Sequence, residues 1–586
     1  MEVRSLIEYI NTLCVVAIPD GTRCEVRAHT DAGWVCGLSR WAEGGALYAS
    51  FRAVPYAKQP VGHLRFKELD PPEPWHNLLD ATVEGPTCHQ EDVIYGSIMQ
   101  PRGISEACIH ANVHVPLDAL PYNNRRRRLA PPLTTAFKDH EAPAGRDPGL
   151  PVVVFVHGGG FQGGSGDADL HGPEYLVTKN VVVITFNYRL NTFGFLSLNN
   201  SLIPGNQGLR DQVTLLRWVQ RNARAFGGDP TNVTLLGQSA GAAATHLLTL
   251  SKATKGLFRR AFIMSGTAIS GFFSASPLYA QQLSTMFLTI LGINTTDPAD
   301  EIHRQLIQMP VEKINDANRL MINQFGLTTF LPTVESEFPG VTRVLDEDPE
   351  VLVANGRGKD VPLIIGFTDV ECEVFRRRLD QIDIGSKIND NLLVTVPANV
   401  AFTTPPDFLP DIAKKIDQKY YNGTADTDKF IKFCTDGFYQ YPALKLAEIR
   451  AASGGAPVYL YRFSYNGDYS VFKDALDIEY EGAAHIEDLT YLFRVNSMLG
   501  IHNSFPPKER DDFMKDWMTT FLINFMQCSK PVCKDTTLWP QAQPERLQLQ
   551  EIHDPDVYRH RNLTEKEQDI VHFFDTTKYC GCWYCS

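Results

Sequence analysis

The chain has 586 residues, of which 43% are hydrophobic and 21% are charged, a composition that allows a large buried core. Its formal net charge of −13 argues against nucleic acid as a partner. No apolar run reaches the roughly 18 residues that span a bilayer, which argues against a membrane protein. The composition indicates a globular protein and leaves its oligomeric state open.

The first 24 residues form an atypical N-terminal segment. Glu2, Glu8 and Asn11 interrupt what would be the apolar core of a signal peptide. Twelve cysteines and five N-x-S/T sites are nevertheless typical of the secretory route, so we expect a secreted glycoprotein, with a protein that stays inside the cell as the alternative. Asn232 adjoins a predicted strand and is expected to be unmodified. The candidates for glycosylation are Asn199, Asn294, Asn422 and Asn562.

Residues 26–54 alternate in hydrophobicity and carry several glycines, which predicts a small antiparallel sheet leading into the main one. Cys88 and Cys108 then bracket a polar loop. A disulfide between them would stabilise the fold by about 3 kcal/mol, and two free thiols are the alternative. The basic run at 125–128, followed by a stretch rich in proline and alanine, indicates an exposed insertion, with a protease processing site as the alternative.

Continuous apolar runs predict strands that are buried on both faces of a mostly parallel sheet. Strands and helices alternate, which indicates an α/β fold with a large central sheet flanked by helices. We predict a single domain over residues 25–575, followed by a cysteine-rich tail at 576–586, and we expect residues 278–349 to form a lid or pocket wall. The predicted strands are 151–156, 181–186, 233–236, 261–264, 361–365 and 458–463, with helices at 209–226 and 240–250.

The sequence Gly237-Gln238-Ser239-Ala240-Gly241 lies between a predicted strand and a predicted helix. Glycines flank the serine because a side chain at either place would collide with the adjoining strand or helix. The serine itself must adopt a strained backbone conformation that exposes its hydroxyl. The pattern predicts that Ser239 is a nucleophile.

A glycine run, Gly158-Gly159-Gly160, directly follows the predicted strand at 151–156. Acyl transfer creates an oxyanion, and unobstructed backbone N–H groups can stabilise it. We therefore predict an oxyanion hole formed by the N–H groups of Gly159, Gly160 and Ala240.

A nucleophilic serine needs a general base, and the base needs an acid that orients it. In hydrolases of this kind the chain order is serine, acid, histidine. Asp369 and Glu371 follow the predicted strand at 361–365, and we favour Glu371 as the acid. His485 lies in a turn of small residues before an apolar run, and we predict that it is the base.

These motifs resemble the type B carboxylesterases of the α/β-hydrolase superfamily, the cholinesterase-like group, over nearly the whole chain. The resemblance implies that Glu371 is the acid, and it implies structural ion pairs of Arg65 with Glu106 and of Arg189 with Asp211. The further matching motifs are VPYA at 54–57, LRF at 64–66, NYR at 187–189, GN at 205–206 and FGGDP at 226–230.

Within this family the chain is similar to insect esterases that carry glutamine before the nucleophile, as Gln238 does here, and that cleave a sesquiterpenoid methyl ester in the haemolymph. A cationic ester would favour an acidic neighbour of the serine and a tryptophan in the loop between Cys88 and Cys108, and both are lacking. We therefore expect a small, apolar ester substrate. Candidate pocket residues are Phe161, Trp218, Phe272, Phe273, Thr328, Phe330 and Tyr439.

The sequence thus predicts a serine carboxylesterase that works through an acyl-enzyme and needs no metal or organic cofactor. A broad detoxifying or odorant carboxylesterase is one alternative, because the sequence does not separate substrates of similar apolarity. A non-catalytic adhesion relative of the same fold is a second alternative.

Overall fold

The computed structural model describes residues 24–92, 94, 99, 102–121, 149–325, 329–468, 470–498, 509–555 and 557–577. The N-terminal segment as far as residue 23, the basic run at 125–128, Thr328 and the end of the tail from residue 578 lie outside these residues.

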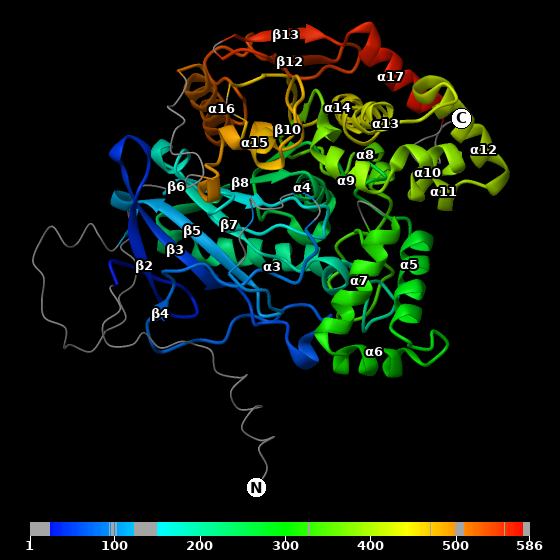
Figure 1. Ribbon diagram of the computed structural model, residues 1–586. Coiled ribbons are helices and arrows are strands. Elements are labelled where there is room, and N and C mark those ends of the chain that lie inside the picture. Colours follow the sequence, from blue (N-terminus) through cyan, green and yellow to red (C-terminus); the bar gives the residue numbers. More distant parts are fainter. Residues whose placement is uncertain are drawn as a thin grey trace, which may run out of the picture.

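One thirteen-stranded sheet runs through the described part of the chain (Figure 1). Its order is β1-β2-β3-β5-β7-β6-β8-β9-β10-β11-β12-β13, with the short β4 beside β2. The strands are β1 (Val26–His29), β2 (Trp34–Trp41), β3 (Leu47–Pro55), β4 (Leu79–Asp80), β5 (His110–Pro116), β6 (Leu150–Val156), β7 (Val182–Phe186), β8 (Gly228–Gln238), β9 (Arg260–Met264), β10 (Leu363–Thr368), β11 (Val458–Phe463), β12 (Gln548–Ile552) and β13 (Arg559–Asn562).

The central part of the sheet, from β7 to β12, is parallel, as predicted. The residues of β7 and β9 are all buried, which explains why these strands read as continuous apolar runs. The predicted antiparallel entry is formed by β1, β2 and β3. It continues through β5, which was not predicted, and joins the main sheet through the antiparallel pair β5 and β7.

Helices pack against this sheet, with α3 and α4 against β8, α16 against β6 and β8, and α14 against β10 and β11. The helices are α2 (Asn191–Phe195), α3 (Gln207–Asn222), α4 (Ala240–Leu250), α5 (Pro277–Ile290), α6 (Ala299–Gln308), α7 (Val311–Phe325), α8 (Pro349–Ala354), α9 (Arg376–Gln381), α10 (Ile384–Asp390), α11 (Ala398–Thr403), α12 (Leu409–Ile416), α13 (Thr427–Cys434), α14 (Tyr441–Ala452), α15 (Val471–Leu476), α16 (Glu509–Cys528) and α17 (Glu565–Thr576).

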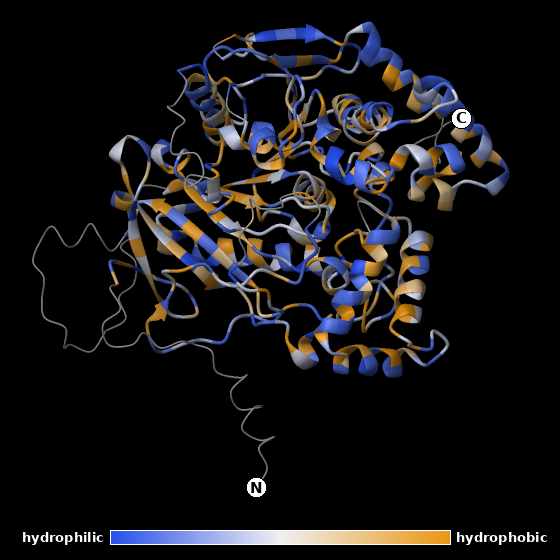
Figure 2. Ribbon diagram, in the orientation of Figure 1, coloured by the Kyte–Doolittle hydropathy of each residue, from blue (hydrophilic) through white to orange (hydrophobic). Residues whose placement is uncertain are grey.

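Two groups of helices project beyond the sheet on the same side of the molecule, α5 to α7 and α10 to α12 (Figure 1). Hydrophobic and hydrophilic stretches alternate along α5 and α6 in Figure 2, which is the pattern of amphipathic helices. The first group confirms that residues 278–349 contain helices. Its proposed role as a lid or pocket wall stays a prediction.

Parallel strands bring their carboxyl ends to one edge of the sheet, and ligand sites in α/β proteins form at that edge. The glycine run follows β6, Ser239 follows β8, and Glu371 follows β10 in the short helix η9 (Glu371–Phe375). The fold therefore gathers the predicted site residues from segments that are far apart in the sequence.

Candidate active site

Ser239 forms a sharp turn between β8 and α4, with φ of 60° and ψ of −127°. This is a strained conformation for a residue with a side chain. A Cβ at Gly237 would lie 2.2 Å from the Gly241 carbonyl oxygen, and a Cβ at Gly241 would lie 2.1 Å from the carbonyl oxygen of Val156. Both glycines are therefore required by close packing, as the sequence predicted. The Ser239 N–H donates to the carbonyl of Met264 on β9, at 2.8 Å, and anchors the turn.

His485 and Glu371 form a fully buried pair. His485 Nδ1 lies 2.6 Å from Glu371 Oε2, and neither side chain is exposed. The other carboxylate oxygen of Glu371 accepts a hydrogen bond from the Thr368 N–H at 2.8 Å. The Nδ1–H of His485 donates a hydrogen bond to Glu371. Because the proton of the neutral imidazole is then on Nδ1, Nε2 keeps the lone pair that a general base needs.

Asp369, the alternative acid, does not contact the imidazole in the described contacts. Its Oδ1 accepts from the Ala483 N–H at 2.8 Å, and its Oδ2 lies 3.8 Å from an Arg462 nitrogen. The geometry therefore favours Glu371 as the partner of His485.

Gln238, which precedes the serine, is completely buried and reaches the other nitrogen of the histidine. Its Nε2 lies 3.2 Å from His485 Nε2. Its Oε1 packs next to Gly158, where an added Cβ would come within 2.6 Å. The residue beside the nucleophile thus presents a neutral amide to the base in place of a second carboxylate.

The glycine run forms a tight loop that requires glycine at Gly159 and favours it at Gly160. Gly159 and Gly160 have φ of +109° and +64°, and a Cβ at Gly159 would lie 2.1 Å from the Gly163 carbonyl oxygen. Ala240 is the first residue of α4, where N–H groups have no partner within the helix. Whether these three N–H groups bind an oxyanion stays a prediction.

An aromatic cluster extends outward from His485 and contains three of the predicted pocket residues. The Tyr439 ring lies 4.9 Å from the His485 ring, and it contacts Phe273 at 5.8 Å and Phe272 at 6.0 Å. Phe438, which the sequence reasoning missed, stacks on Phe272 at 5.1 Å. The cluster gives the base an apolar surrounding on this side.

The remaining predicted pocket residues have different environments. Phe161 is buried and contacts Phe195 at 4.9 Å, and Phe330 contacts Phe287 at 5.5 Å. Trp218 on α3 contacts Phe226, which places it in a cluster of core packing.

The segment after α7 reaches the glycine loop through Thr329, because the Thr329 hydroxyl donates to Gln162 Oε1 at 3.3 Å. Thr328 lies outside the described residues.

The two structural ion pairs that the resemblance implied are present. Arg65 Nε lies 2.6 Å from a Glu106 oxygen, and Arg189 and Asp211 approach to 2.5 Å. Asp211 also accepts from the Arg189 backbone N–H, so this pair fixes the loop after β7 to α3.

Four disulfides link the described part of the chain, whereas the sequence reasoning proposed only Cys88–Cys108. One of the others, Cys372–Cys434, joins the residue after Glu371 to the end of α13, beside the segment that carries Tyr439. The sequence contained no signal for this pairing, because its two cysteines are separated by 62 residues. The remaining disulfides are Cys24–Cys36 and Cys528–Cys533.

The four glycosylation candidates Asn199, Asn294, Asn422 and Asn562 are all exposed. Asn232 instead accepts a hydrogen bond from Arg260 at 2.6 Å. Modification of the four exposed candidates stays a prediction.

No helix in the described residues is both long and apolar enough to cross a membrane.

A mostly parallel sheet, a nucleophile-type turn after one of its strands and a buried histidine–glutamate pair define the α/β-hydrolase class. Residues 24–571 match the family model described as "Carboxylesterase family". The chain belongs to the carboxylesterase family, and it is a carboxylic ester hydrolase.

Comparisons with individual proteins agree with this assignment. The chain is 56% identical to juvenile hormone esterase of Heliothis virescens over 94% of each chain. It is 30% identical to esterase FE4 of Myzus persicae over 94% of this chain and 92% of the relative. The crystal structure of juvenile hormone esterase from Manduca sexta with OTFP covalently attached matches with a TM-score of 0.88 and 57% identity, covering 94% of this chain and 99% of that chain.

Proposed function

We propose that this protein hydrolyses the methyl ester of juvenile hormone, a sesquiterpenoid, to the free acid and methanol. The observation that carries the proposal is the similarity to juvenile hormone esterases, which extends over 94% of the chain at 56% identity. The neutral Gln238 beside the base and the aromatic cluster around Tyr439 support an uncharged, apolar substrate.

In the proposed mechanism Ser239 Oγ attacks the ester carbonyl while His485 Nε2 takes its proton. The imidazolium that forms is stabilised by Glu371, 2.6 Å from Nδ1. The tetrahedral oxyanion accepts hydrogen bonds from the N–H groups of Gly159, Gly160 and Ala240, each of which contributes about 3 kcal/mol to transition-state stabilisation.

His485 then returns its proton to the departing methoxide, and methanol leaves with the acyl group bound to Ser239. Water attacks this acyl-enzyme while His485 Nε2 takes its proton. The imidazolium then gives that proton to Ser239 Oγ as the bond to the acyl group breaks, which releases the acid and regenerates the serine. Every step in this sequence uses side chains and N–H groups of this chain alone.

We also infer that the protein is secreted and that residues 25–575 act as one domain. Four disulfides support an oxidising compartment. Strands from β1 to β13 belong to a single sheet, which supports the single domain.

The substrate assignment is tested by comparing kcat/KM on three esters of different chemistry: juvenile hormone, a short aryl acetate and a choline ester. We expect a strong preference for the hormone, with methanol and the acid formed in equal amounts. If the short ester is preferred, the protein is a broad carboxylesterase. A preference for the choline ester would contradict the role given to the neutral Gln238.

A further inference from the structure

The loop that carries His485 is held by three consecutive backbone N–H groups. The N–H of Ala483 donates to Asp369 Oδ1 at 2.8 Å, that of Ala484 to Glu487 Oε2 at 2.6 Å, and that of His485 to the Glu371 carbonyl at 3.1 Å. The residue after the histidine, Ile486, has φ of 81°, which is strained for a β-branched side chain. The surrounding hydrogen bonds thus hold the histidine loop in a conformation that it would not adopt alone.

Asp369 is, besides Glu371, a side chain that crosses from the acid loop to this histidine loop. Its own N–H donates to the Phe463 carbonyl at 3.1 Å, and the next N–H, that of Val370, donates to the carbonyl of Ala483 at 3.1 Å. Gly482 leaves the space that the carboxylate occupies, since a Cβ there would lie 2.8 Å from both carboxylate oxygens. The carboxylate therefore lies in a fitted position between the two loops.

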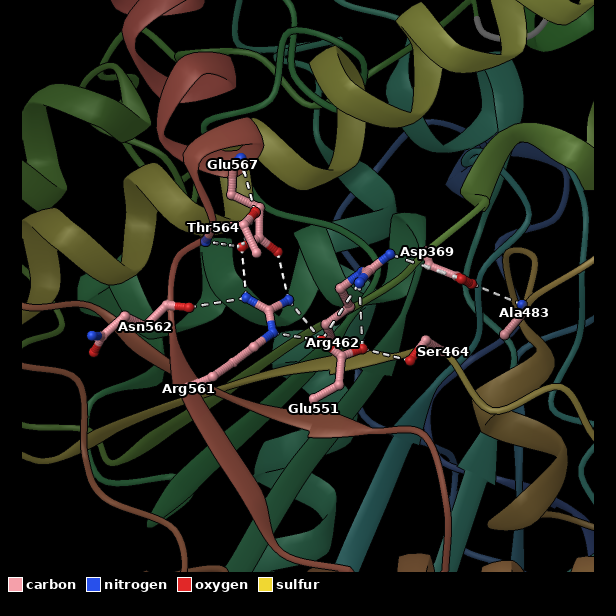
Figure 3. Close-up of polar contacts among 9 residues, drawn as sticks. All are labelled: Asp369, Arg462, Ser464, Ala483, Glu551, Arg561, Asn562, Thr564 and Glu567. Atoms are coloured by element: carbon pink, nitrogen blue, oxygen red, sulfur yellow. Dashed lines mark hydrogen bonds and ion pairs between the residues drawn. The ribbon is translucent and has the colours of Figure 1, made fainter.

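A series of side chains with alternating charge extends from this carboxylate (Figure 3). Arg462 lies 3.8 Å from Asp369 and 3.4 Å from Glu551. Arg561 then joins Glu551, at 2.6 Å, to Glu567, at 2.7 Å.

The far end of this series is the first turn of α17. Glu567 accepts the backbone N–H of Thr564 at 2.7 Å and completes a capping box at the start of that helix. The charges therefore connect the C-terminal hairpin and α17 to the two loops of the candidate active site.

We propose that Asp369 is a positioning residue, which sets the histidine loop against Glu371 and is itself oriented by Arg462, Glu551 and Arg561. Asp369 touches neither the imidazole nor the serine in the described contacts, so it acts on the reaction through the backbone of residues 483–485. The proposal rests on the proposed catalytic roles of Ser239, His485 and Glu371.

The test is the kcat and KM of Asp369→Ala and Asp369→Asn on a short aryl acetate. Alanine leaves the buried Ala483 N–H without its acceptor and lets the histidine loop move. A displacement of about 1 Å at a reacting group costs up to about a hundredfold in rate, so we expect kcat to fall about ten- to a hundredfold. Because the aromatic cluster is untouched, we expect KM to stay within about twofold.

Asparagine keeps an acceptor oxygen for the Ala483 N–H and loses only the charge that faces Arg462. Because the positioning hydrogen bond is retained, we expect kcat of Asp369→Asn to stay within about threefold of the wild-type value.

Asp346→Ala is the matched control. The Asp346 side chain is 15% exposed, against 17% for Asp369, and it pairs with Arg357 and Lys252. It therefore reports what the loss of a comparable structural ion pair does to kcat, and we expect kcat to be unchanged. Thermal midpoints of all variants are measured alongside.

Three results would overturn the proposal. They are an unchanged kcat in Asp369→Ala, a loss in Asp369→Asn as large as in the alanine variant, and an equal loss in Asp346→Ala. If Asp369→Ala does not fold, Asp369→Leu takes its place. Leucine resembles aspartate in shape but has no acceptor for the Ala483 N–H, so an unchanged kcat there would also overturn the proposal.

Ser239→Ala is assayed in the same series to distinguish a failure of the proposed catalytic function from a failure of the positioning role of Asp369. If Ser239→Ala keeps its activity, the proposed catalytic function fails. If Ser239→Ala is inactive while Asp369→Ala is fully active, only the positioning role fails.

Discussion

Glu371→Gln tests the orientation of the general base. The Thr368 N–H donates to Glu371 Oε1 at 2.8 Å, so a glutamine at this position must keep its carbonyl oxygen on that side. Its NH2 group then faces His485 Nδ1, which lies 2.6 Å from the present carboxylate oxygen. Two donors cannot share one hydrogen bond, so Nδ1 becomes the acceptor and the proton moves to Nε2.

A histidine in that tautomer has no lone pair on Nε2 with which to accept the proton of the serine. The same change from carboxylate to amide in a Ser-His-Asp triad lowers kcat by about 10⁴-fold, which is about 5 kcal/mol of transition-state stabilisation. We expect a loss of that order in the steady-state kcat of Glu371→Gln on an aryl acetate, with an unchanged fold by circular dichroism.

A Glu371→Gln variant within about tenfold of the wild-type kcat would refute this reasoning, because loss of the correct tautomer leaves no efficient base. It would show that Glu371 is not the acid that orients His485.

Two further predictions concern groups next to the triad. Gln238→Glu places a carboxylate about where Gln238 Nε2 now lies, 3.2 Å from His485 Nε2. Because a nearby negative charge stabilises the imidazolium, we expect the acid limb of the kcat/KM profile to move to higher pH by about one unit or more. An unmoved limb would contradict that contact. Glu371 is the carboxylate that contacts the ring in the described residues, and the Tyr439 ring lies beside it. Burial raises the pKa of the Asp488 carboxyl to about 7, from an ordinary value of 3.8. The folded state therefore keeps a proton that the unfolded chain releases, and stability falls between about pH 4 and pH 7, by about 4 kcal/mol in all. Asp488→Asn removes this dependence, so its thermal midpoint should gain on the wild type as pH rises through that window, and a constant gap would contradict the burial argument.

The sequence predicted the central residues of the site because each one is tied to a local pattern. Gly237 and Gly241 leave no room for a side chain because neighbouring backbone lies too close. The glycine pattern around the serine therefore indicates this close packing in the sequence itself. The strands β6 to β11 were predicted because burial on both faces leaves continuous apolar runs.

Features that depend on contacts between distant segments could not be predicted in this way. The Cys372–Cys434 disulfide and the bond between Asp369 and the Ala483 N–H join segments that pack together only in the folded chain. Trp218 was proposed for the pocket because it is aromatic. It packs against Phe226, and its place in the pocket stays a prediction, because residue type alone does not distinguish a pocket wall from core packing.

The most direct test of the account is kcat/KM of the purified protein on juvenile hormone, measured for the wild type and for Ser239→Ala, with a short aryl acetate as the reference ester. We expect the wild type to prefer the hormone strongly and the Ser239→Ala variant to lose the hydrolysis of both esters. Hydrolysis of the hormone by Ser239→Ala, or a wild type that hydrolyses only the short ester, would contradict it.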